Sequence, residues 1–368
     1  MRNRSTFQAL VHRRRGVILI MSLWAVGLLG LLAWNLASRA RLNIALADYR
    51  ALAFESELEG RSGLARGLWL IRNDAQVEID HLGEPWAIPT TPSPPESSDS
   101  PETNPQRDAQ PEIGIYIKDE FSKVNINLVD RDTLRDILDR YYGFDIQADA
   151  LADAITDWID TDENGSYESN ADERSGSFVG PRNDAIPVIE ELMDIRGVSP
   201  WLFFGEDADG NGSLGPEEDD GERTLPVDNE DSVLQLGLRD LFTVQGDGTM
   251  NVNTTSGVLL ESVLTSIVGL ADAKKLVQAL NAKRFGNDGV LGTQDDSPFM
   301  SRQEIAEIFG AEAWRQIEAS NFDFDITTSM FAIGVHVKMP EDGAVYSARG
   351  LVARSSNGGT ELLSWVSD

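Results

Sequence analysis

The sequence contains no cysteine and only three histidines, His12, His81 and His336, among its 368 residues. Without cysteine the chain forms no disulfide and offers no thiolate. The three histidines lie far apart in the sequence, which argues against a histidine-dependent triad and against a multi-histidine zinc site. The motifs G-x-S-x-G and H-E-x-x-H, the P-loop and the dinucleotide fingerprint are also absent. We therefore expect a protein that is not an enzyme.

Basic residues are scarce outside the N-terminus. Lysine and arginine number 31 against 61 acidic residues, which gives a net charge of −30. Residues 1–41 carry arginines and no acid, so the remainder of the chain is more negative than this total. A surface of this charge repels nucleic acid and attracts cations such as calcium. We therefore expect no nucleic-acid partner.

The first long feature is an uncharged segment from Val17 to Ser38. As a helix it measures about 33 Å, which matches a bilayer core of about 30 Å. The segment is long for the apolar core of a signal peptide, and no A-x-A cleavage site follows it. The arginines before it place the N-terminus in the cytoplasm and the acidic bulk outside. By composition alone, a plain single-pass anchor explains these features.

The residues VHRRRGVILIM (11–21) resemble the N-terminus of type IV prepilins, with a basic leader, a glycine and a long apolar helix. The resemblance implies that a prepilin peptidase cuts after Gly16, leaving Val17 as the new and often methylated N-terminus. Most pilins carry a glutamate at the fifth mature position, where this chain has Met21. A carboxylate in hydrocarbon is costly unless it is paired, and in pilins it pairs with the amine of a neighbouring subunit. An apolar residue suits a subunit at a filament tip, and this departure is typical of type II secretion system protein K (GspK).

No proline occurs before Pro85, so the sequence permits one helix from about Val17 to about Arg72. Its first half is expected in lipid and its second half is amphipathic. Three glycines weaken the second half by about 1 kcal/mol each, namely Gly60, Gly63 and Gly67.

Downstream, a strand is expected near 76–80, then a disordered or extended Pro-rich loop over 85–111, then a strand from about 113. KVNINLVDRDTLRDIL (123–138) recurs as TMNVNTTSGVLLESVL (249–264), each with N-x-N before a leucine-bearing helix. We expect Asn127 and either Thr254 or Thr255 to cap these helices. Three C-terminal strands, 330–339, 344–354 and 360–366, are separated by the turns PEDG and SNGG.

The region 264–280 resembles a helix-hairpin-helix or SAM-like module. Such hairpins bind DNA phosphate through a G-x-G turn, but here the turn at 268–271 has only Gly269, and its surroundings are acidic. Phosphate contact requires positive potential. We therefore expect the module to pack against protein.

The complete layout resembles protein K, with VNIN, ADAITDWIDTDEN and MNVNTTS as its landmarks. The resemblance implies an α+β fold: a pilin-like N-terminal helix and a small antiparallel sheet, interrupted by a large helical insertion with two SAM-like units. The expected divisions are a leader (1–16), a transmembrane half-helix (17–38), an amphipathic helix with first strands and the Pro-rich loop (39–122), a first helical unit with acidic insertions (123–245), a second helical unit (246–318) and C-terminal strands (319–368).

Two acidic segments have calcium-loop spacing. DADGNGSLGPEE (207–218) fits D-x-D-x-N-G-x5-E, and its residues after the loop are poor helix formers, so we expect a calcium loop without a full EF-hand pair. The expected ligands are Asp207, Asp209, Asn211, Ser213 and Glu218.

The second segment, 160–173, repeats the opening spacing but lacks an acid at position twelve. Its candidate ligands are Asp160, Asp162, Asn164, Glu168, Asp172 and Glu173. A third cluster, 286–296, is better explained as a solvated loop. In protein K, the resemblance implies calcium in the helical insertion. We expect a structural role, because a cation offsets repulsion among carboxylates.

The leading hypothesis is a minor pseudopilin at the tip of the type II secretion pseudopilus. It would assist assembly and secretion across the outer membrane, with other minor pseudopilins and the prepilin peptidase as partners. It would be a single-pass inner-membrane protein with a cytoplasmic N-terminus and a periplasmic C-terminal domain. The alternatives are a minor pilin of a type IV pilus or competence system and a plain membrane-anchored calcium-binding periplasmic protein. A membrane-anchored hydrolase with paired acids is a further alternative, which the missing motifs disfavour.

Overall fold

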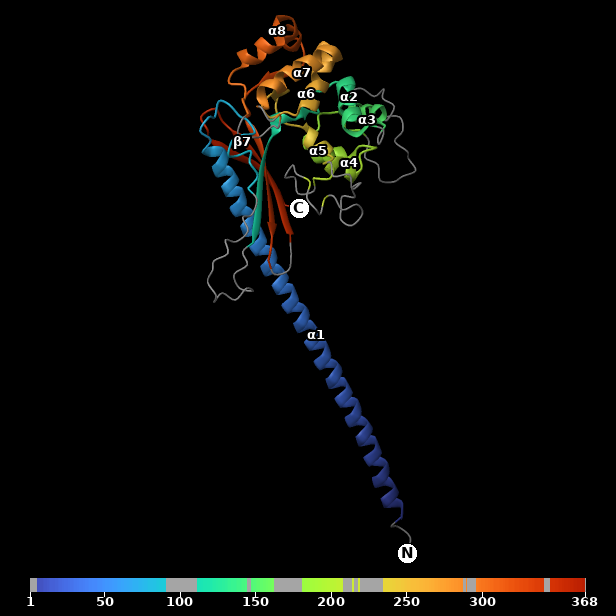
Figure 1. Cartoon of the computed structure of the whole chain (residues 1–368). Helices are drawn as coiled ribbons and strands as arrows, with labels where there is room; N and C mark the ends of the chain where they lie inside the picture. Colours follow the sequence, from blue (N-terminus) through green and yellow to red (C-terminus); the bar gives the residue numbers. More distant parts are fainter. Residues whose placement is uncertain are drawn as a thin grey trace. The chain divides into compact units, whose positions relative to one another are not determined.

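The computed structural model describes residues 5–90, 111–143, 147–161, 181–207, 214, 218, 234–286, 289, 296–340 and 345–367. The chain divides into two compact units, Met1–Leu58 and Glu59–Asp368. One helix, α1 (Ser5–Arg72), begins in the first unit and ends in the second. The predicted helix to about Arg72 is therefore confirmed (Figure 1).

Within the first unit, α1 is long and apolar enough to cross a membrane. An 18-residue window of the helix has a mean hydropathy of 1.9, and none of that window is buried within the protein. The indole side chains of Trp24 and Trp34 are 75% and 71% exposed. A helix is suited to crossing a membrane because it satisfies its own backbone hydrogen bonds in the absence of water.

The second unit contains a four-stranded antiparallel sheet in the order β1-β6-β7-β8. The predictions of a strand from about 113 and of three C-terminal strands are confirmed. At the SNGG turn, Ser355 N donates to Gly359 O at 2.8 Å. The PEDG turn lies outside the described residues except for Pro340. The strand bounds are β1 (Glu112–Asp119), β6 (Met330–Lys338), β7 (Val345–Arg354) and β8 (Thr360–Ser367).

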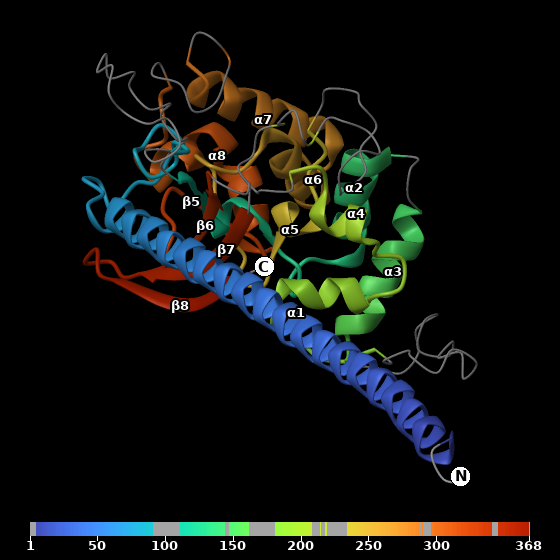
Figure 2. The ribbon, with the colours of Figure 1, turned by 90° about the horizontal axis from the view of Figure 1, so that it is seen from below.

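The last turns of α1 pack closely on one face of this sheet, and Figure 2 shows them beside the C-terminal strands. A Cβ atom added at Gly60, Gly63 or Gly67 would lie 2.2, 2.5 or 2.8 Å from a side-chain atom of the sheet. The side chains that these glycines meet are those of Tyr346, Val335 and Ile333, respectively. The glycines that weaken the helix therefore allow its close approach to the strands.

The helical part of the second unit joins the sheet at one end of two neighbouring strands. β1 ends at Asp119, which pairs with Phe331 near the start of β6. Residues 120–329 therefore leave and rejoin the sheet at the same end. Their helices are α2 (Arg131–Tyr142), α3 (Ala148–Ile159), α4 (Pro200–Phe204), α5 (Leu238–Leu241), α6 (Gly257–Val268), α7 (Leu270–Arg284) and α8 (Arg302–Glu318), with 3-10 turns η1 (Glu120–Ser122) and η3 (Ile189–Asp194).

One buried apolar cluster, which runs from Val124 to Ile326, includes side chains from α2 through α8. The two helical units predicted from the sequence thus share a core. α6 and α7 form the hairpin around Gly269, whose φ of 81° is in the region that favours glycine.

The repeated N-x-N segments form the same local structure twice. β2 (Val124–Asn125) pairs in parallel with β3 (Phe242–Thr243), and β4 (Thr249–Asn251) pairs in parallel with β5 (Asp323–Asp325). Two residues after the end of β2, and again two residues after the end of β4, lies an asparagine. Its side chain forms hydrogen bonds with both the N–H and the C=O of one residue in a distant loop. Asn127 accepts from Ile186 N and donates to Ile186 O. Asn253 makes the same two bonds with Phe299.

The prediction that Asn127 caps a helix is therefore wrong. Asp130 caps α2 by accepting from Asp132 N and Thr133 N. Ser256, which accepts from Leu259 N, is the N-cap of α6 in place of Thr254 or Thr255. The cap lies one to three residues after the expected site, because Asn127 and Thr254 have partners elsewhere in the fold and Thr255 Oγ1 donates to Asn251 O.

The predicted strand at 76–80 is also wrong, because these residues form turns. Gln76 N donates to the side chain of Asp74 at 2.8 Å, which is an Asx-turn. Asp80 N donates to Ile326 O at 2.8 Å, outside any strand. The carboxylates in this segment hold the backbone in a loop, which an apolar–polar alternation cannot reveal.

Candidate functional site

The predicted processing site lies within α1. Gly16 and Val17 both belong to this helix, which continues through them without a break. Met21, one turn further on, is 67% exposed. The uncharged part of α1 therefore presents an apolar surface with no carboxylate at the position that most pilins give to glutamate.

Two of the predicted ligands in the segment 207–218 are described, and both are buried. Asp207 is 0% exposed and Glu218 is 8% exposed. Lys118 Nζ lies 3.0 Å from Asp207 Oδ2, so an ammonium already occupies one side of the first expected ligand. Asp209, Asn211 and Ser213 lie outside the described residues.

Lys118 also contacts Asp240 Oδ1 at 3.1 Å and thereby connects β1 to α5. Burial alone would lower the pKa of Lys118, but the carboxylates of Asp240 and Asp207 outweigh it, so the pKa is raised. Burial raises the pKa of Asp240, but Lys118 and Arg239 bring it below its ordinary value. The cluster is thus an ion pair in its charged form.

In the segment 160–173, Asp160 follows α3, and its backbone N–H donates to Thr156 O. It is half-buried. The other expected ligands, Asp162, Asn164, Glu168, Asp172 and Glu173, lie outside the described residues.

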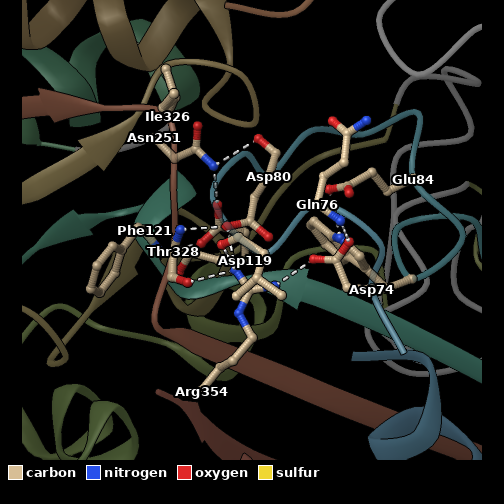
Figure 3. A network of polar contacts seen from close by, with 12 residues as sticks. Asp74, Gln76, Asp80, Glu84, Asp119, Phe121, Asn251, Ile326, Thr328 and Arg354 are labelled. Carbon is tan, nitrogen blue, oxygen red and sulfur yellow. Dashed lines mark hydrogen bonds and ion pairs between the residues drawn. The ribbon is translucent and has the colours of Figure 1, made fainter. Parts of the chain in front are cut away.

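A polar network that the sequence did not suggest joins the sheet to the helical part (Figure 3). Asp119, at the end of β1, accepts from Phe121 N, Thr254 Oγ1 and Asn251 Nδ2 at 2.7, 2.6 and 3.0 Å. Its side chain is buried, and burial raises its pKa against these hydrogen bonds, which lower it. Asn251 therefore ties the N-x-N segment to the end of the sheet.

Arg354, at the end of β7, anchors the other side of this network. Its guanidinium contacts Asp74 Oδ2 at 2.7 Å and Asp80 Oδ2 at 2.5 Å. Asp80 Oδ2 also accepts from Thr328 N at 2.7 Å. These contacts join residues about 250 to 280 positions apart. Only the N-x-N repeat pointed towards this region, and no spacing in the sequence connects Asp80 with Arg354.

The fold resembles that of a solved structure. A chain in the crystal structure of the GspK-GspI-GspJ complex from the enterotoxigenic Escherichia coli type 2 secretion system matches with a TM-score of 0.54 and 14% sequence identity. The match covers 88% of this chain and 99% of that chain. No family model and no curated protein matches the sequence. The likeness confirms the predicted α+β arrangement of a long N-terminal helix, a small antiparallel sheet and further helices.

Proposed function

We propose that this chain is a minor pseudopilin at the tip of a type II secretion pseudopilus, where it assists assembly and protein secretion. The observation that carries the proposal is the fold likeness, which covers nearly all of a chain from the GspK-GspI-GspJ complex of a type 2 secretion system. At 14% identity the likeness shows the fold, so the function is an inference from it. Met21 gives independent support from the sequence.

The proposed action is binding and placement, without catalysis. The apolar surface of α1 is suited to packing on sister helices in a membrane or filament. Met21 needs no amine from a subunit above it, because it carries no charge. The helical part, residues 120–329, adds bulk at one end of the sheet. We infer that this bulk blocks further subunits.

The proposal includes processing and topology. The prepilin peptidase cuts after Gly16, and Val17 becomes the methylated N-terminus. The N-terminus lies in the cytoplasm, the apolar part of α1 spans the inner membrane, and the second unit lies in the periplasm. The apolar helix supports a single-pass anchor, and the arginine-rich leader supports the orientation.

We also propose that the acidic segments 160–173 and 207–218 bind structural calcium. Asp207 and Glu218 are buried oxygen donors, which fits a hard cation. Calcium at the segment 207–218 would share Asp207 with the Lys118 ammonium. The role of the ion would be to neutralise these carboxylates and order the segments.

Affinity purification of the full-length protein from its own cells tests the proposed function. We expect other minor pseudopilins to co-purify, and N-terminal sequencing to begin at Val17. A matched preparation of the chain with Gly16→Leu should retain Met1 and lose the partners. Recovery of pilus subunits alone would favour a type IV pilus or competence role. An intact Met1 in the wild-type protein, without partners, would favour the plain anchor.

A further inference from the structure

Three carboxyl groups converge in the loop between α1 and β1, apart from the segments 160–173 and 207–218. Asp74, Asp80 and Glu84 each place an oxygen so that the three oxygens lie within 4.8 Å of one another. The side chains of Asp74 and Asp80 are 2% and 0% exposed, and Glu84 is 6% exposed. Figure 3 shows Asp74, Asp80 and Glu84 around one small region beside Arg354.

Each carboxyl group is held in place by donors. Asp80 Oδ2 accepts from Thr328 N and Arg354, and Asp74 Oδ2 accepts from Arg354 Nη1. Glu84 Oε2 accepts from His81 N at 2.9 Å and Trp86 Nε1 at 2.8 Å. These donors fix the positions of the carboxyl groups. Surrounding hydrogen bonds of this kind orient carboxylates that ligate metals.

One oxygen of the group lacks a hydrogen-bond partner within the described part of the chain. Asp80 Oδ1 is buried there and accepts no hydrogen bond from any described residue. A buried carboxylate oxygen without a partner is costly. Asp74 and Glu84 place oxygens within 4.8 Å of each other, and two carboxylates at this range repel unless a proton or cation lies between them.

The charges of these groups also favour a bound cation. Arg354 pairs with Asp74 and Asp80, so if all three carboxyl groups are ionised its single positive charge leaves two negative charges in a buried place. A divalent cation would balance the two charges.

We propose that Asp74, Asp80 and Glu84 bind a calcium ion. Calcium prefers carboxylate oxygens at about 2.3–2.6 Å, so two ligands on opposite sides of the ion lie about 4.8 Å apart. The three oxygens fall within that limit, and water supplies the remaining ligands. The ion joins the turn after α1 to Thr328 and β7 through Arg354, and so locks the loop onto the sheet. The proposal does not depend on a place at the tip of a filament.

Terbium luminescence of the full-length protein in detergent tests this site. Terbium is a probe for calcium sites, and Trp86, which donates to Glu84, is placed to excite it. Added calcium should displace terbium from this site and thereby reduce the emission that Trp86 excites. We expect Trp86→Phe to lack this calcium-sensitive part of the emission. Trp24→Phe, which removes an exposed tryptophan of the membrane helix, should leave that part unchanged. Equal emission from wild type and Trp86→Phe would overturn the proposal.

Calorimetric calcium titration provides the second measurement. We expect Glu84→Gln to bind one ion fewer than wild type, because it removes a charge and keeps an acceptor for His81 N. The control Glu78→Gln makes the same change at an exposed residue of the same loop and should bind the wild-type number. An unchanged stoichiometry in folded Glu84→Gln would mean that Asp74 and Glu84 share a proton instead. If Glu84→Gln does not fold, the result with Trp86→Phe decides.

Discussion

At the scale of single residues, the two asparagine clamps show what the repeated N-x-N motif does. Asn127 and Asn253 occupy equivalent places in the repeat, and each bonds both backbone groups of one distant residue. Asn253 is 1% exposed, whereas Asn127 is half-buried. If the asparagine side chain is removed, water can therefore replace its hydrogen bonds more readily at position 127 than at position 253.

Asn253→Ala should accordingly lower the free energy of unfolding by about 2–4 kcal/mol, because Phe299 N–H and C=O lose their partners inside the core. Asn127→Ala should cost about half as much. Thermal unfolding of the full-length variants in detergent measures both. Equal losses at the two sites would contradict the importance of burial.

Lys118 is a second residue whose charge matters, since it lies between two buried carboxylates. Lys118→Met should lower the free energy of unfolding by about 3–5 kcal/mol, because Asp207 and Asp240 lose their shared cation. Lys275→Met removes an exposed lysine paired with Asp272 and should leave the melting temperature unchanged. A small loss for Lys118→Met would show that the ion pair contributes little.

At the scale of elements, α1 has different requirements along its length. In the long apolar part of α1, a Cβ added at Gly30 would have no atom of the described residues within 4 Å, but one added at Gly63 would lie 2.5 Å from Val335. The same residue type therefore has a packing role at one site and none within the chain at the other. Helix propensity alone treats the two glycines alike.

Gly63→Ala should destabilise the second unit by about 1–3 kcal/mol, because the new methyl group forces the helix away from the sheet. Gly30→Ala should keep the wild-type stability or improve it slightly. Thermal unfolding followed by circular dichroism compares the two. A stabilised Gly63→Ala protein would mean that Val335 moves aside without cost.

At the scale of the whole molecule, the proposed place at a filament tip depends on an apolar residue at position 21. Met21→Glu should reduce secretion several-fold in a complementation assay, because a carboxylate without a partner amine costs about 2.5–3.5 kcal/mol in the bilayer. Met21→Leu should secrete normally. Full activity of the glutamate variant would remove the support that Met21 gives to the tip.

The proposed calcium sites predict that removing calcium destabilises the second unit as a whole. A chelator such as EGTA should lower the melting temperature, and added calcium should restore it, because binding to the folded state alone is stabilising. The variant Asp162→Asn should lose part of this effect if the segment 160–173 binds an ion. No change in melting temperature with chelator or calcium would contradict both metal proposals.

The sequence by itself determined the elements whose signals are local. The uncharged run predicted the long apolar part of α1, and the turns PEDG and SNGG separated the strands that became β6, β7 and β8. It did not determine the caps of α2 and α6, because competing polar side chains lie within a few residues of each other. The tertiary structure alone decided which of them face distant partners.

The network of Asp74, Asp80 and Arg354 depends entirely on tertiary structure. Its members are separated by up to 280 residues and come from a loop and a strand end. Periodicity records how a residue relates to its near neighbours, whereas a buried charge is defined by what the complete fold encloses with it. For this reason spacing in the sequence predicts two acidic calcium-binding segments, whereas only the fold brings three further carboxyl groups together beside one arginine.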